Sequence, residues 1–86
     1  MNFIYQSPPK EGESVWTPLG IGIVSKIIAY EEVVQEMRLN KATSEEIERF
    51  KARVIHFLGE TNHYYECEID SEDGSFRVDW SDWRPG

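Results

Sequence analysis

An acidic stretch near the end of the chain has the residue types that bind hard cations. Asp70, Glu72 and Asp73 lie close together and are followed by Gly74. Clustered carboxylate oxygens are the usual protein ligands of calcium. The spacing does not match an EF-hand loop that starts at Asp70, because one ligand position would fall on Gly74 and the bidentate acid on Ser81. The stretch therefore predicts a solvated turn rather than a calcium site.

Imidazole and thiol side chains offer a second kind of chemistry. His56, His63 and Cys67 are the only such donors in the chain, and a zinc site needs three or four ligands that converge. We expect His56 on the polar side of a helix and Cys67 as a small buried residue, so metal and thiol chemistry are not predicted. The sequence also lacks phosphate-binding, dinucleotide-binding, zinc-protease and nucleophile-elbow motifs. These patterns predict a non-catalytic protein without a cofactor.

The charge balance restricts the kind of partner. Sixteen acidic residues against nine basic ones give a net charge of −7. A negative field repels phosphate backbones, so direct nucleic-acid binding is not expected, whereas a basic protein would be attracted. The acids expected to form a partner-binding face are Glu66, Glu68, Asp70, Glu72, Asp73 and Asp79. Among the basic residues, Arg77 is expected near them.

Apolar residues outside the predicted core are candidates for a second contact surface. Val24, Ile28 and Leu39 lie off the main apolar stripe of the helix predicted for this region, which gives that helix more apolar surface than one stripe needs. Trp83 follows the last predicted strand, and two alternatives stay open for it. Its ring either closes the end of the core or is exposed for a partner.

Two helices are predicted from apolar periodicity. Between residues 22 and 39 the apolar residues follow one another in steps of four and three, which is the spacing of one helix face. The second helix, residues 44–58, begins with a capping box formed by Thr43 and Glu46 and ends at Gly59. The short connection between the two predicts an antiparallel helical hairpin.

A β-hairpin is predicted over residues 63–80, because apolar and polar residues alternate on both sides of Asp73-Gly74. A two-residue turn at this dipeptide would place Ile69 opposite Val78, and a longer loop would place Ile69 opposite Phe76. Both registers keep the apolar residues on one face, whereas a slip by one residue would not. The buried face is therefore predicted, and the two registers stay open.

Together these elements predict a single α+β domain over residues 1–86. The helical hairpin packs on a small antiparallel sheet, which contains the C-terminal hairpin and a short strand at residues 2–5. Residues 7–20 are expected to be a loop whose Val15 and Trp16 pack onto the rest. The predicted core consists of Ile23, Ile27, Tyr30, Val34, Ile47, Phe50, Val54, Phe57, Tyr65, Cys67, Ile69, Val78 and Trp80.

The sequence also indicates a compartment. It has no apolar run long enough to span a membrane, and its first residues lack the basic and apolar regions of a secretory signal. Its single cysteine fits a reducing environment. We therefore expect a cytoplasmic protein without a membrane partner.

A different fold is suggested by several short motifs. These are the sequence VWTPLGIGIV at residues 15–24, Tyr65, Asp73-Gly74-Ser75, Trp80 and Arg84-Pro85. In this order they resemble small SH3-like or Tudor-like barrels. The resemblance implies a small barrel with a helical insertion, in which residues 21–30 form a strand. The helical spacing of the same region favours the helix instead. The last hairpin is also similar to that of PepSY-type domains, as any Asp-Gly hairpin is.

These features favour a small acidic protein-interaction module, such as an adaptor, an inhibitor or an immunity-type protein, that binds a basic partner. One alternative is self-association, in which Val24, Ile28 and Leu39 meet their copies across a two-fold axis. Another is a DNA mimic that occupies a nucleic-acid-binding enzyme. A small enzyme is the least favoured, because a chain of 86 residues has little room for a closed pocket.

Overall fold

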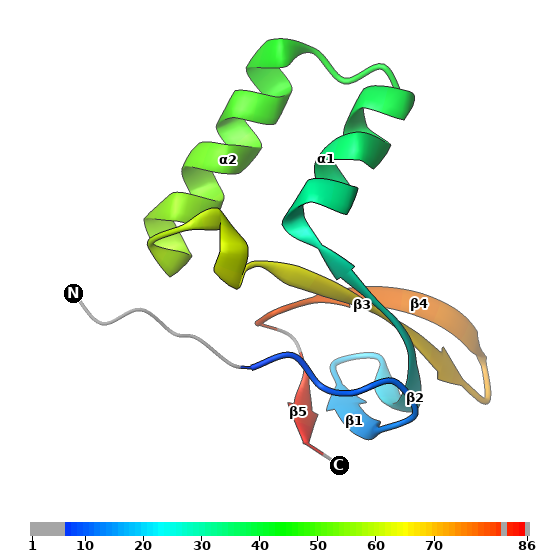
Figure 1. The fold of residues 1–86 in the computed structure, drawn as a ribbon. Coiled ribbons are helices and arrows are strands. Elements are labelled where there is room, and N and C mark those ends of the chain that lie inside the picture. The colour runs from blue at the N-terminus through cyan, green and yellow to red at the C-terminus, as the bar shows by residue number, and fades with distance from the viewer. Residues whose placement is uncertain (1–6, 82, 86) are drawn as a thin grey trace.

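The computed structural model describes residues 7–81 and 83–85 (Figure 1). In chain order the elements are β1 (Ser14–Thr17), β2 (Gly20–Ala29), α1 (Tyr30–Leu39), α2 (Ser44–Leu58), the 3₁₀ turn η1 (Thr61–His63), β3 (Tyr65–Ser71), β4 (Gly74–Asp79) and β5 (Arg84–Pro85). The strand predicted at residues 2–5 lies outside the described residues.

The strands form one antiparallel sheet in the order β4-β3-β2-β1-β5. The two helices are inserted between β2 and β3 and stand over one end of the sheet (Figure 1). The α+β class, the helical hairpin and the C-terminal β-hairpin are therefore as predicted. The barrel alternative also required a helical insertion and a strand at residues 21–30, and β2 occupies nearly that range.

The first helix is ten residues long and begins at Tyr30, so the prediction of a helix from residue 22 is wrong. The residues before it belong to β2, which pairs with β1 on one side and β3 on the other. Half of β2 consists of isoleucine and valine, which favour strands because their branched side chains fit a pleated surface. Pairing with two neighbours outweighs the helical spacing of the apolar residues.

A β-bulge at Ser25 determines which way the apolar residues of β2 point. The pairing with β3 shifts between Val24 and Lys26, and the Ser25 hydroxyl donates to the main-chain oxygen of Glu68 at 3.1 Å. Because a bulge adds one residue to the alternation, Val24 faces one side of the sheet and Ile28 the other. Both are buried, so the prediction that they form an exposed apolar surface is wrong.

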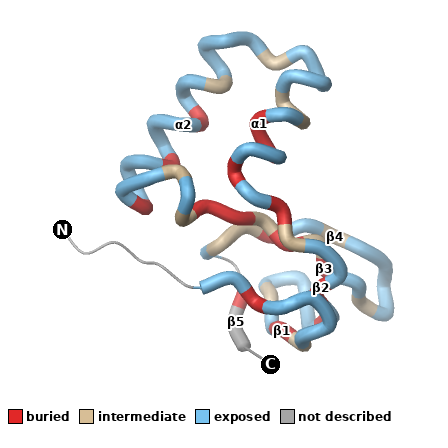
Figure 2. Tube along the Cα trace, in the orientation of Figure 1, coloured by how far each residue is buried: buried red, intermediate tan, exposed pale blue. Residues whose placement is uncertain are grey.

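The apolar residues form two cores, which the strand register places on opposite sides of the sheet. Figure 2 shows their buried residues in both the helices and the strands. The helix core lies between the helices and the sheet and contains Ile28, Tyr30, Val33, Val34, Phe50, Val54, Leu58 and Tyr64. The inner core lies on the opposite side of the sheet and contains Val15, Val24, Tyr65, Cys67, Ile69, Val78 and Trp83. Trp80 is partly buried and packs against both.

Most of the predicted core is buried, with two clear exceptions. Ile23 is 46% exposed because it lies on the outer side of β2, away from the inner core. Phe57 is exposed because Leu58 takes the last inward position of α2, and its ring contacts His56 instead. In the first hairpin Val15 is buried as expected, but Trp16 is exposed, since neighbouring residues of a strand face opposite sides.

The register of the β3–β4 hairpin is the second of the two predicted alternatives. Ile69 pairs with Phe76, and the pairing continues to Ser71 and Gly74. The turn therefore consists of Glu72 and Asp73. It is neither the predicted two-residue turn at Asp73-Gly74 nor a four-residue loop over Ser71–Gly74, although the register is the one that this longer loop predicts. The Ser71 hydroxyl stabilises it, because it accepts from the Asp73 amide at 3.2 Å and donates to the Gly74 carbonyl at 2.9 Å.

The second helix is confirmed with its predicted ends. The Thr43 hydroxyl accepts from the Glu46 amide at 3.1 Å, and the Glu46 carboxylate accepts from the Thr43 amide at 3.2 Å. Gly59 caps the other end with a positive φ of 84°. In the described part of the chain, neither helix has the length and apolar composition needed to cross a membrane.

Candidate functional site

The strand acids of the predicted partner-binding face lie on the side of the sheet that the helices partly cover. This side is here called the outer face. Residues paired across strands share a face, so Glu66, Glu68 and Asp70 of β3 lie on the same side as their partners on β2 and β4. Ile28, the partner of Glu66, is buried beneath the helices. The outer face thus has a helix-covered end, a charged middle and an end beyond the helices.

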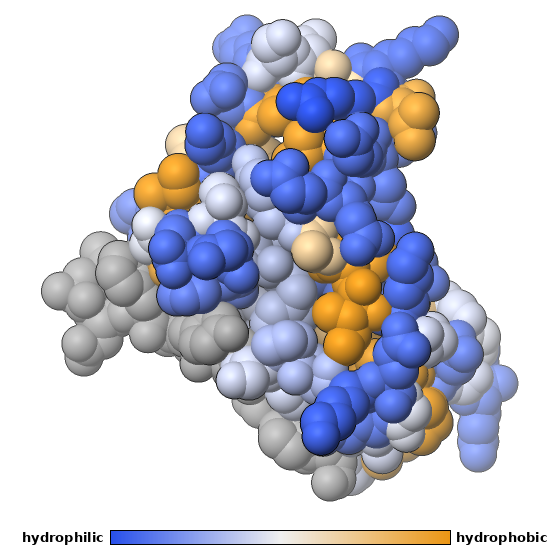
Figure 3. Space-filling model, in the orientation of Figure 1, coloured by the Kyte–Doolittle hydropathy of each residue, from blue (hydrophilic) through white to orange (hydrophobic). Residues whose placement is uncertain are grey.

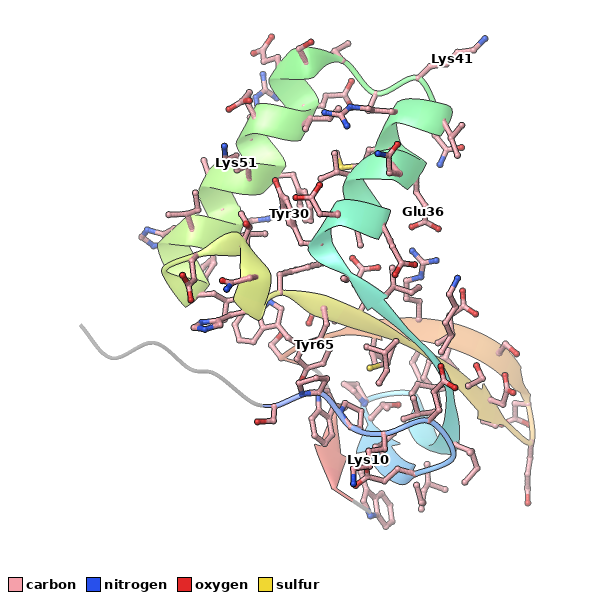
Figure 4. All side chains as sticks on the ribbon, viewed as in Figure 1. Lys10, Tyr30, Glu36, Lys41, Lys51 and Tyr65 are labelled. Carbon is pink, nitrogen blue, oxygen red and sulfur yellow. The ribbon has the colours of Figure 1, made fainter. Side chains whose placement is uncertain are left out.

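Arg77 is the centre of the charged middle. Its guanidinium donates two hydrogen bonds to the Glu36 carboxylate of α1, at 2.7 and 2.9 Å. It also donates to Glu66 at 3.2 Å and to Glu68 at 3.4 Å. Figure 4 shows Glu36 directed from α1 toward the strands. One cation therefore holds three carboxylates and ties the first helix to the edge strand of the sheet.

The ion pairs in this cluster shift the protonation equilibria of their members. The hydrogen bond from Arg77 lowers the pKa of Glu36 from its ordinary 4.5, and the same bond raises the pKa of Arg77. Burial raises the pKa of Tyr64, whose hydroxyl donates to Glu66 at 2.5 Å. At neutral pH Glu36 is ionised and Tyr64 is protonated, which is the state that these bonds require.

Two hollows flank Arg77 between the helices and the sheet. The larger, of about 480 Å³, is lined by the end of α1 and by the turn that follows it, and the smaller, of about 340 Å³, is lined by α2 and β4. Both include Glu66 and Arg77. General acid catalysis needs a carboxyl group whose pKa is raised toward neutrality. The Glu36 shift has the opposite sign, so this cluster has the character of a structural ion pair.

The predicted acids divide into three groups. Glu66 and Glu68 are bound to Arg77, as described above. Asp79 accepts from the main-chain amide and the hydroxyl of Ser81, at 2.9 and 2.7 Å, and so shapes the turn after β4. The remaining acids form the hairpin tip, which consists of Asp70, Glu72 and Asp73.

The hairpin tip is the exposed part of the acidic set. All three of its acids are exposed. Asp70 accepts a hydrogen bond from the Ser75 hydroxyl at 2.7 Å, which is a neutral donor. Among the lysine and arginine side chains that the structure describes, none lies at ion-pair distance from any of the three. The negative charge of the tip therefore faces solvent.

An apolar patch next to the tip was missed by the sequence analysis. It consists of Trp16, Ile21 and Ile23, whose exposed fractions are 54%, 49% and 46%. Trp16 pairs with Ile21 across β1 and β2, and Ile23 pairs with Asp70 on β3, so the patch and the tip are continuous on the outer face. The signal was the alternation of these residues with the small or buried Val15, Gly22 and Val24, which appeared in a region assigned to a loop and a helix.

Apolar side chains reach the surface elsewhere too. Figure 3 shows them over the strands and again on the helices, with hydrophilic side chains between them. Leu39, the last residue of α1, is 82% exposed, and Leu19, in the turn between β1 and β2, is also exposed. Of the predicted apolar contact residues, Leu39 alone is on the surface, so these residues do not form one patch.

Trp83 belongs to the inner core, so the alternative that exposed its ring to a partner is wrong. It is 5% exposed, and its indole Nε1 donates to the Tyr65 hydroxyl at 2.6 Å. The Tyr65 hydroxyl in turn lies 3.5 Å from the Ser7 carbonyl. A hydrogen-bond partner for the indole N–H avoids the free-energy cost of burying an unpaired polar group. The ring closes the core beside β5.

The imidazole and thiol groups have different surroundings. Cys67 is fully buried, and burial raises its pKa to about 11, so its thiol is un-ionised at neutral pH. His63 lies 2.9 Å from a Glu60 carboxylate oxygen, and the His56 ring packs edge-on against Phe57. Over residues 7–81 and 83–85, histidine, cysteine and acidic side chains form no group of three that could hold a metal ion.

Comparison with protein-family models, with curated proteins and with solved structures gives no match to this chain.

Proposed function

We propose that this protein is a non-catalytic interaction module that binds a basic protein partner through the hairpin tip. The observation that carries the proposal is the contrast within the acidic set. Arg77 forms ion pairs with Glu66 and Glu68, as well as with Glu36 of α1, whereas the three tip acids face solvent with no cation at ion-pair distance among the side chains that the structure describes. Unpaired like charges at one end of a surface favour association with a partner of opposite charge and speed its encounter.

The experiment is affinity capture from a lysate of the native host at low and high salt. The test variant replaces the tip acids by Asp70→Asn, Glu72→Gln and Asp73→Asn. The matched control removes the same number of charges from the helices, by Glu31→Gln, Glu45→Gln and Glu48→Gln. We expect a basic partner that is retained at low salt by the wild type and by the control, and that is lost by the tip variant. Equal capture by both variants would contradict the proposal.

The other candidate functions have less support. Self-association through Val24 and Ile28 is not possible in the folded chain, because both are buried. A DNA mimic would use the same tip acids, and a partner captured in the lysate would identify it if that partner were a nucleic-acid-binding enzyme. For an enzyme, the described residues offer no specific observation beyond the two hollows beside Arg77.

A further inference from the structure

We infer that the partner binds as an amphipathic basic helix, whose apolar stripe packs on Trp16, Ile21 and Ile23 while its basic flank reaches the hairpin tip. This inference rests on the proposed function and specifies its partner. The surface has two adjacent parts with different chemistry. The patch supplies three large apolar side chains on neighbouring positions of β1 and β2, and the tip supplies the acids beside them.

The continuity of the two parts follows from the strand register. Ile23 is the cross-strand partner of Asp70, and cross-strand partners lie with their Cβ atoms about 5 Å apart. Glu72 and Asp73 follow in the turn of the same hairpin. A ligand that covers Ile23 therefore has acidic groups at its margin. An interface with an apolar centre and a charged rim is the arrangement found in specific protein complexes.

The choice of a helix comes from the other end of the same face. There the chain covers the sheet itself, since Val33 and Val34 of α1 and Phe50 and Val54 of α2 form one core with Ile28 of β2. Ile28 and Ile23 are both β-branched residues of β2 on the outer face, and the first is 2% exposed whereas the second is 46% exposed. The outer face is thus covered at one end by helices that each present an apolar stripe, and a helix of the same kind would fit its exposed end.

The charge of the partner follows from complementarity. The tip acids have no cation among the described residues, and the whole chain carries a net charge of −7. A helix with lysine or arginine beside its apolar stripe would satisfy both parts of the surface at once. An acidic or uncharged amphipathic helix would satisfy only the patch, and a basic peptide without apolar residues only the tip.

Three synthetic peptides distinguish these cases. The first is an amphipathic helix of leucine and lysine, the second an oligolysine of equal charge, and the third the leucine–glutamate counterpart of the first. Binding is measured by calorimetry and by tryptophan emission, because Trp16 is exposed and Trp83 is buried. We expect tight binding of the leucine–lysine helix alone, with a blue shift of emission that the variant Trp16→Phe abolishes while binding remains.

Variants separate the patch from the tip. The double substitution Ile21→Thr and Ile23→Thr keeps β-branched residues in the strand and should weaken binding of the leucine–lysine helix about tenfold or more, as loss of central apolar contacts does. Substituting the three tip acids should weaken it at low salt and much less at high salt. The three helix acids replaced above serve again as the control, and circular dichroism verifies that each variant is folded.

The outcomes decide between this inference and the proposed function. Equal binding of oligolysine, or unchanged affinity of the threonine double variant, would overturn the helix inference while leaving an electrostatic partner in place. Failure of both basic peptides, together with a lysate capture that is negative, would overturn both. Sedimentation in which the protein associates with itself, and in which the threonine variant is monomeric, would assign the patch to a second copy and overturn the helix inference.

Discussion

At one end of the outer face α1 and α2 cover the sheet. At the other end Trp16, Ile21 and Ile23 of the patch are exposed. Beneath the helices Ile28 is buried, and the acids nearest to it are bound by Arg77. Beyond the helices, Ile23 is exposed, and no described lysine or arginine side chain lies at ion-pair distance from Asp70. The same strands thus carry a surface completed within the chain and a surface left open. The partner proposed above would bind at the open surface.

The strands that carry the exposed patch bury their opposite side in the inner core. The inner core lies beneath β1, β2 and β3, and its members Val15, Cys67 and Ile69 are fully buried. We therefore expect that substitutions in the patch leave the fold intact, whereas substitutions in the inner core do not. Substitutions on the two sides of the sheet test this separation.

The largest effect is expected for the two tryptophans that differ most in exposure. Trp83→Ala removes a buried ring and leaves the Tyr65 hydroxyl without its donor, so the free energy of unfolding should fall by about 3–5 kcal/mol. Trp16→Ala, on the outer face, should cost under about 1 kcal/mol. Urea denaturation measures both values. Similar losses for the two variants would show that the patch contributes to the core.

A smaller effect is expected at Gly22, where β2 and β3 approach closely. A Cβ atom there would lie 2.4 Å from Ile69 Cγ2 and 2.7 Å from the main-chain oxygen of Asp70, so the strands would have to move apart. Gly22→Ala should lower the free energy of unfolding by about 1–3 kcal/mol. The control is Gly20→Ala, which has open space around it but a φ of 120° and so reports backbone strain alone. A loss of under about 0.5 kcal/mol at Gly22 would contradict the close approach.

The next smaller effect is expected for Arg77, which connects α1 to the sheet. Arg77→Met removes the shared cation from three carboxylates and should lower the free energy of unfolding by about 1–2 kcal/mol at neutral pH. Lys26→Met is the control, because Lys26 makes a single exposed ion pair at 3.9 Å with Glu32. Its substitution should change stability by under about 0.5 kcal/mol.

The same residue gives a prediction on pH dependence. Arg77 lowers the pKa of Glu36 from 4.5, so the folded protein binds fewer protons than the unfolded chain in this range. The resulting stabilisation is complete above the unfolded value and is lost as the pH falls through the folded one. The variant Arg77→Met should show a shallower loss of stability between neutral pH and acid. Parallel profiles of the two proteins, measured by urea denaturation, would contradict the assignment.

The smallest effect is expected within the patch. Ile23→Thr keeps a β-branched residue at an exposed position and should change the free energy of unfolding by under about 0.5 kcal/mol. The matched substitution Ile28→Thr places a hydroxyl in the helix core and should cost about 2 kcal/mol or more. Thermal unfolding followed by circular dichroism compares them. An equal cost for both would mean that the two ends of the outer face do not differ in burial.

The parts of the fold that were predicted correctly depend on local signals. The capping box at Thr43 and Glu46 and the stop at Gly59 lie within a few residues of the bonds that they make, so α2 was defined by the sequence around it. The buried face of the β3–β4 hairpin followed from alternation for the same reason. In β2, helical spacing and strand-forming composition disagreed, and a pairing with the distant β3 decided between them.

The candidate site shows the same division. The acids of the tip were expected at the end of a hairpin, and they are there. Arg77 was expected near the acids of the hairpin, but its bond to Glu36 was not predictable, because Glu36 belongs to a helix far away in the chain. The patch was not predicted, because a sequence does not distinguish an exposed isoleucine from a buried one. The pairing of β1 with β2 determines which isoleucines are exposed.

The bulge at Ser25 has a consequence for changes in chain length. With Ser25 removed, Val24, Lys26, Ile27 and Ile28 would alternate strictly and keep the sides that they have now. The side that each residue faces would therefore survive the deletion, whereas the extra twist that a bulge gives its strand would be lost. A deletion of Ser25 should therefore yield a folded protein with a flatter sheet. Each core would keep its residues, and only the twist of the sheet around them would change.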